Sequence, residues 1–162
     1  MSLKNKLKKI ERIIIENADS CTYSGPVSQS EILKAEIDMG IQFPVSYLWF
    51  LMTFGHGFFA DDEIFGMDSI YNPGHQFGIP YVASTTQILR ERYSIPREYF
   101  AVSGDGQGYY YLASAGSGDR RQDADMYLLD INTGEIELLL NEKECPVQLS
   151  DFFEAAFEDR DF

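Results

Sequence analysis

The segment from Phe43 to Phe59, FPVSYLWFLMTFGHGFF, constrains the fold most, because seven of its side chains are aromatic. Pro44 suits the first turn of a helix, where its missing N–H has no helical partner, and Gly55 suits the end of one. A helix from Pro44 to about Phe54 would be apolar on nearly every side, and such a helix is buried. We therefore interpret these aromatic side chains as core. The alternative is an aromatic box that binds a ligand.

The other helices are marked by amphipathic spacing and by signals at their ends. Residues 3–17 repeat aliphatic side chains at helical intervals. Ser28 and Glu31 have the spacing of a capping box, and Gly40 suits the left-handed residue that ends a helix. Residues 21–28, which precede this helix, are expected to form a loop. The predicted helices are 3–17, 28–40, 44–54, 84–93 with Thr85 or Thr86 as alternative caps, and a C-terminal helix capped by Ser150.

The second half of the chain has the short strands and glycine-containing turns of β-hairpins. The predicted strands are one near Glu63–Phe65, a strand–turn–strand unit over 97–114, and a hairpin over 126–140 with its turn at 132–134. Helices come first, then strands with one helix between them, then a closing helix. This order predicts an α+β fold, one domain over residues 1–162, with a largely antiparallel sheet packed by helices from the N-terminus, the middle and the C-terminus.

The chain is strongly acidic, with 26 Asp and Glu against 13 Lys and Arg and a net charge of −13. Such a body repels phosphate backbones, so direct nucleic-acid binding is disfavoured, and it attracts basic proteins. The alternative is that the charge serves only solubility. Basic residues concentrate in the first helix, where they either line an exposed face or dock onto a second copy of the chain. These residues are Lys4, Lys6, Lys8, Lys9 and Arg12.

No apolar stretch is long enough to span a membrane, and the N-terminal segment lacks the apolar length and cleavage site of a signal peptide. The negative charge of the chain also opposes binding to an anionic lipid surface. Cys21 and Cys145 are far apart and outside any CxxC motif, so reduced thiols are expected. We expect a soluble, cytoplasmic protein.

The order of these segments resembles that of the SUKH superfamily, which includes fungal Smi/Knr-type cell-wall regulators and bacterial immunity proteins. The stretch AEIDMGIQFPVSYLWFLMTFGHG resembles the family signature, with Phe43 in place of the usual leucine and FGHG in place of an asparagine–glycine end. IFGM, YFAVSGDGQGYYYLAS, DADMYLLDINTGEI and LSDFFEAAF resemble the later strands and the closing helix, so the resemblance covers residues 28–158. The signature positions are occupied here by Glu36, Gly40, Ile41, Pro44, Tyr47, Phe50, Leu51 and Gly55.

The resemblance implies a non-enzymatic, protein-binding domain without a cofactor. Bacterial members are immunity proteins that neutralise a toxin, often a nuclease, so the implied partner is a basic toxin domain. The fungal members imply an alternative, which is a regulatory scaffold that binds a cellular protein.

Acidic and aromatic residues on the predicted loops are the candidates for contact with a partner. Asp61, Asp62 and Glu63 form an acidic turn that would meet the lysines and arginines of a nuclease site. Exposed aromatic side chains nearby would anchor the complex. The candidates are Phe58, Phe59 and Tyr71 as anchors, and Asp61, Asp62, Glu63, Asp105, Asp119, Asp123 and Asp125 as the acidic surround.

The patterns for catalysis and metal binding are weaker. His56 and His75 are the only histidines, and they lack HxxxH or HExxH spacing, so no metal site is expected. A small hydrolase that uses one of them is the enzymatic alternative. Ser103 lies outside a GxSxG motif, and the glycines after it are expected to form a turn rather than a phosphate-binding loop. We expect no catalytic residue.

Overall fold

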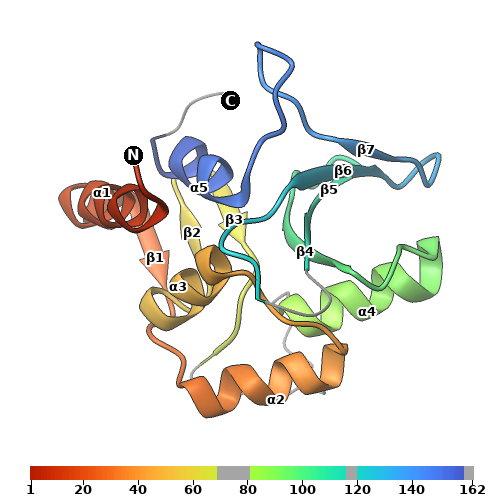
Figure 1. Cartoon of the computed structure of the whole chain (residues 1–162), viewed down its shortest axis with the longest axis horizontal. Coiled ribbons are helices and arrows are strands. Elements are labelled where there is room, and N and C mark those ends of the chain that lie inside the picture. The colour runs from red at the N-terminus through yellow and green to blue at the C-terminus, as the bar shows by residue number, and fades with distance from the viewer. Residues whose placement is uncertain (69–80, 116–119, 159–162) are drawn as a thin grey trace.

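A computed structural model describes residues 1–68, 81–115 and 120–158 (Figure 1). These residues form five α-helices and a seven-stranded antiparallel sheet, which confirms the expected α+β class. The helices are α1 Leu3–Glu16, α2 Gln29–Met39, α3 Val45–Thr53, α4 Val82–Tyr93 and α5 Leu149–Glu158, with a short 3₁₀ turn at Ala18–Ser20. The strands are β1 Cys21–Tyr23, β2 Gly57–Phe59, β3 Asp62–Ile64, β4 Tyr99–Gly104, β5 Tyr109–Ser114, β6 Met126–Asp130 and β7 Ile136–Leu138.

The sheet is a meander in which each strand pairs with the next strand along the chain. Phe58 pairs with Glu63 between β2 and β3, and Tyr110 pairs with Leu129 between β5 and β6. Because consecutive strands are antiparallel, the turns β2–β3, β4–β5 and β6–β7 all leave the sheet at one end. We call this the hairpin end. The connections β1–β2, β3–β4 and β5–β6 lie at the opposite end.

Helices cover both faces of the sheet. Along β4, Phe100 and Val102 pack into the larger apolar cluster with α1, α2, α3 and α5, whereas Ala101 points into a second cluster with Leu89 of α4. This alternation is the two-residue period of a strand. Figure 1 shows α1 beside α5, and α2 beside α3 and α4.

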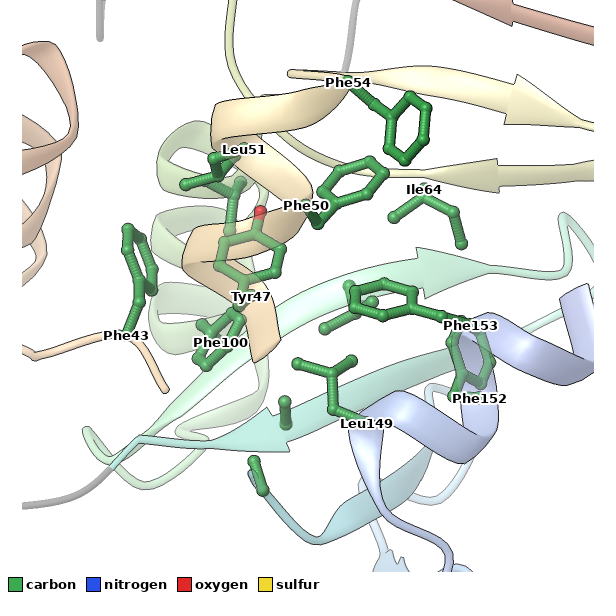
Figure 2. Packing of buried hydrophobic residues seen from close by; sticks show 14 of the residues in the cluster. Phe43, Tyr47, Phe50, Leu51, Phe54, Ile64, Phe100, Leu149, Phe152 and Phe153 are labelled. Carbon is green, nitrogen blue, oxygen red and sulfur yellow. The ribbon is translucent and has the colours of Figure 1, made fainter. Parts of the chain in front are cut away.

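The aromatic side chains from Phe43 to Phe54 pack in the core, as expected. Phe43, Tyr47 and Phe50 are completely buried, and the ring of Phe50 stacks on Phe153 of α5 with centroids 5.3 Å apart (Figure 2). The hydroxyl of buried Tyr47 donates a hydrogen bond of 2.6 Å to the carbonyl of Phe65, so its polar atom is satisfied. The run therefore joins α3 to the sheet and to the closing helix.

The predicted ends of α2 are confirmed. The Ser28 hydroxyl accepts the N–H of Glu31 at 3.3 Å, and Gly40 adopts the left-handed conformation with φ of 69°. Pro44 lies one position before α3 rather than inside its first turn. The prediction of a loop throughout residues 21–28 is wrong for 21–23, which form the edge strand β1 against β2.

Two predicted helix starts are also wrong. The helix α4 begins at Val82, and Thr85 and Thr86 lie buried inside it, where the Thr86 hydroxyl accepts the N–H of Ala101 at 3.0 Å. The helix α5 begins at Leu149, so Ser150 lies inside its first turn. There the N–H and hydroxyl of Ser150 both donate to the carboxylate of Asp123, at 3.2 and 2.6 Å. The acceptor at this helix start therefore comes from a distant loop.

Candidate partner-binding surface

The hairpin end gathers carboxylates from three successive turns. In sequence, the segments 57–64, 103–112 and 128–139 that form this end contain no lysine or arginine. The topology places their acidic side chains at one end of the sheet, although they are separated by up to half of the chain. These residues are Asp61, Asp62 and Glu63 of the first hairpin, Asp105 of the second, and Asp130, Glu135 and Glu137 of the third.

The phenol of Tyr111 on β5 links the first two turns. Burial raises the pKa of Tyr111, and the negative charges of Asp105 and Asp62 raise it further. Both carboxylates therefore lie near a single side chain, which also packs against Phe152 with ring centroids 5.0 Å apart. The candidates Asp62 and Asp105 thus lie near one another, whereas the Glu63 carboxylate is directed to His56.

The turns are held in shape by their own carboxylates. Asp105 accepts the N–H groups of Gln107 and Tyr109 on Oδ1, at 2.7 and 3.0 Å. Asp130 accepts the N–H of Asn132 at 2.9 Å in the same manner. Such side chain–backbone bonds are typical of ordered turns. The acidic surface is therefore built on a preorganised backbone, which lowers the entropy lost on binding.

The two phenylalanines of β2 point in opposite directions. Phe58 has half of its surface exposed beside the acidic turn, whereas Phe59 is completely buried and lies 4.4 Å from the ring of Phe157. Phe58 is therefore available as an anchor. The prediction that Phe59 is an anchor is wrong, because the period of the strand turns it into the core. Tyr71, His75 and Asp119 lie outside the described residues.

Asp123 and Asp125 lie at the opposite end of the sheet and do not extend the acidic surface. Asp123 accepts hydrogen bonds from the Ser46 hydroxyl at 2.9 Å, from its neighbour Ala124 and from Ser150. Asp125 accepts from the side chain of Gln148. Both carboxylates hold loops to helix ends, and their prediction as part of the acidic surround is corrected accordingly.

His56 is a buried connector between segments. Its Nδ1 accepts the N–H of Gly66 at 3.0 Å, and its Nε2 lies 3.1 Å from the carboxylate of Glu63. Burial lowers the pKa of His56, and the charge of Glu63 acts in the opposite direction. The buried hydroxyl of Ser103 donates to the carbonyl of Glu63 at 2.6 Å. Within residues 1–68, 81–115 and 120–158, no three His, Cys, Asp or Glu side chains gather as they would around a metal ion.

The basic side chains of α1 divide between two environments. Lys6 pairs with Asp151, and Lys9 lies 3.5 Å from Glu154 and 3.8 Å from Glu158, all three carboxylates belonging to α5 of the same chain. Lys4, Lys8 and Arg12 line the exposed face of the helix. Sequence reasoning missed the pairing within the chain, although the acidic residues of α5 recur at helical spacing and could have indicated it.

Sequence reasoning also missed a cluster of arginines at the opposite end of the sheet. Arg97 precedes β4, and Arg120 and Arg121 follow β5 after a gap in the described residues. Together with the exposed side of α2 they line an open groove. The adjacent arginines at 120 and 121 are the one local signal in the sequence, because the residues around them are mostly acidic or polar.

These features define a small α+β domain with acidic side chains on its hairpin turns. A sequence model of the family SUKH_5, described as SMI1-KNR4 cell-wall, matches residues 5–129, and the chain belongs to this family. The match includes α1, which lies outside the stretch 28–158 that carries the resemblance seen in the sequence. Membership supports a protein-binding role like that of SMI1 and KNR4 proteins.

No curated protein matches the chain. Among the described residues, none of the helices combines the length and apolarity that crossing a membrane requires.

Proposed function

We propose that the chain is a non-enzymatic immunity protein that binds a cognate secreted toxin and blocks its catalytic domain. The observation that carries this proposal is the hairpin end, where ordered turns present carboxylates without a lysine or arginine among them. A nuclease must hold a phosphate backbone and therefore carries lysines and arginines around its site. An acidic surface of this kind would cover those residues and compete with the nucleic acid.

The same surface accounts for the speed that an immunity protein needs. Opposite charges steer two proteins together and raise their association rate constant. Phe58, which is half exposed and pairs with Glu63 between β2 and β3, would supply an aromatic anchor at the edge of the contact. The role requires no catalytic residue, cofactor, metal, membrane or nucleic acid, and neutralisation would take place in the cytoplasm.

A regulatory scaffold is the second candidate, and the family description favours it, because it names SMI1-KNR4 cell-wall proteins. In that case the hairpin end would bind a cellular protein with a basic surface. The two candidates differ in the partner and not in the chemistry of the surface.

The test is coexpression of the chain with the toxin domain encoded beside its gene, with cell growth and a pull-down as the readouts. The variant D61N/D62N/D105N removes three charges, while the amide oxygen introduced by D105N can still accept the backbone bonds of its turn. The matched control D38N/E91Q/E142Q removes three charges from exposed positions away from the hairpin end.

We expect the control to protect cells and the hairpin variant to protect them poorly. Equal protection by both variants would overturn the proposed surface. Failure of the wild-type chain to bind the toxin domain would shift the assignment to the scaffold.

A further inference from the structure

An open groove of about 920 Å³ lies at the end of the sheet opposite the hairpin turns. One wall is the solvent side of α2, with Leu33, Ile37 and the following Ile41. The other wall consists of Arg97, Arg120 and Arg121. We call it the arginine groove. Its size is within the range of specific ligand sites, and it is distinct from the hairpin end.

The helix α2 buries an apolar face with Ile32, Ala35 and Met39, but it also exposes two aliphatic side chains and buries a carboxylate. Its carboxylate Glu36 is only 6% exposed, whereas Leu33 and Ile37 are 56% and 70% exposed. Residues four apart lie on one face of a helix, so the two aliphatic side chains form a continuous apolar wall. A surface helix normally points such side chains inward. The exposed pair is therefore available for an apolar contact with another molecule.

Glu36 is turned inward because it organises the floor of the groove. Its carboxylate accepts two bonds from Arg120, at 3.0 and 3.3 Å, and one from the N–H of Phe43 at 2.7 Å. Arg120 also donates to the carbonyl of Phe43 at 2.6 Å. This network fixes the guanidinium of Arg120 in place and neutralises Glu36.

The other two arginines differ from Arg120 in their contacts. In the described part of the chain neither Arg97 nor Arg121 forms an ion pair, and the contact of Arg121 with the Ser114 hydroxyl is long, at 3.5 Å. Arg97 also lies near Arg90. Burial lowers the pKa of Arg90, and the positive charge of Arg97 lowers it further. Glu98 is the one further carboxylate on the groove lining. Positive charges thus face the groove in a chain whose net charge is −13.

We propose that the arginine groove binds an extended, acidic segment of a protein partner, with its carboxylates on Arg97 and Arg121 and its aliphatic side chains on Leu33 and Ile37. A free inorganic anion would use the arginines and leave the apolar wall exposed. A nucleic acid would be repelled by the charge of the rest of the chain. The groove therefore recognises a partner by a chemistry complementary to that of the hairpin end, and this proposal is independent of the toxin assignment.

The test uses the isotopically labelled full chain and a blocked synthetic peptide of alternating Asp and Leu residues, followed by amide chemical shifts and by fluorescence anisotropy. We expect shifts to concentrate at α2, Gly40, Arg97 and Arg121. The variant R97A/R121A should bind the peptide about tenfold more weakly, because two solvent-exposed ion pairs are lost. The variant L33S/I37S should also weaken binding.

Two controls separate this site from general attraction of an anion. K8A/R12A removes the same two charges from the exposed face of α1 and should bind like the wild-type chain. A peptide with Asn in place of Asp should not bind. Equal affinity of R97A/R121A and K8A/R12A, or shifts scattered over the surface, would overturn the proposal. So would inorganic phosphate that produces the same shifts and displaces the peptide completely, because the groove would then be an anion site.

Discussion

The backbone N–H of Gly66 donates a hydrogen bond of 3.0 Å to Nδ1 of His56. Nδ1 must therefore be unprotonated, and the proton of the neutral ring lies on Nε2, which faces Glu63 at 3.1 Å. The ring joins the turn after α3 to the end of β3 while remaining 6% exposed. If Nδ1 were protonated, its N–H would face the N–H of Gly66, and the hydrogen bond between them would be lost. The folded structure therefore requires the neutral ring.

This arrangement makes stability depend on pH. Burial lowers the pKa of His56 below its ordinary value of 6.5, so the unfolded chain binds more protons in acid than the folded chain does. The stabilisation from the neutral ring is complete above about pH 6.5 and is lost as the pH falls below that value. H56Q should lose about 1–2 kcal/mol of unfolding free energy at neutral pH. In urea unfolding, the difference between wild type and H56Q should shrink between about pH 7.5 and pH 5. A constant or growing difference would contradict the assignment of the neutral ring.

Gly66 itself admits no side chain. A β-carbon at this position would lie 1.6 Å from the carbonyl oxygen of Gly55. The clash is with backbone rather than with the flexible end of a side chain, so it cannot be relieved by a rotamer change. We expect G66A to lose about 3 kcal/mol or more of unfolding free energy. Gly106 offers a matched control, because its φ of 70° is strained for alanine while the space around it is open. G106A should cost only about 1–2 kcal/mol in the same urea experiment. Similar losses for the two variants would show that the close approach relaxes cheaply.

The pair of Glu36 and Arg120 should contribute far more than an exposed pair. E36A would leave the N–H of Phe43 and the guanidinium of Arg120 without their acceptor in a largely buried site. The expected loss is about 3 kcal/mol. K34A breaks the exposed pair of Lys34 with Glu31 on the same helix and should cost less than about 1 kcal/mol. Thermal unfolding of both variants checks the difference, and equal melting temperatures would refute it.

The helix α1 is held mainly by apolar contact and only weakly by its ion pairs. Ile10 is completely buried, so I10A should lose about 2–4 kcal/mol through the cavity that it creates. Lys9 is about half exposed, and K9A should lose less than about 1 kcal/mol. High salt should leave the stability of K9A closer to that of the wild type. A loss for K9A as large as that for I10A would mean that charge, not burial, docks the helix.

Local sequence signals predicted correctly those elements whose ends depend on neighbouring residues. Ser28 and Gly40 define the ends of α2, and the aromatic run from Phe43 defines the core helix α3. These local signals failed for elements that depend on a strand or side chain distant in the sequence. The strand β1 has three residues and exists because β2 pairs with it, and α5 is capped by Asp123, which lies 27 positions before Ser150.

The candidate surface was predictable in composition and not in arrangement. The acidic turn at Asp61 and Asp62 is visible in sequence, but its proximity to Asp105 depends on the order of strands in the sheet. Because β2 was not predicted as a strand, the opposite directions of Phe58 and Phe59 could not be anticipated. The arginine groove depends on contacts between distant segments, such as that of Arg120 with Glu36 of α2.

The central claim is that the hairpin end is the surface that meets a basic partner. The most direct measurement is the association rate constant for the toxin domain encoded beside the gene, by stopped-flow fluorescence at low and at physiological ionic strength. D61N/D62N/D105N should associate about tenfold more slowly than D38N/E91Q/E142Q at low salt, because steering depends on local charge. The difference should narrow at about 150 mM salt. Equal rate constants for the two variants at low salt would contradict the claim.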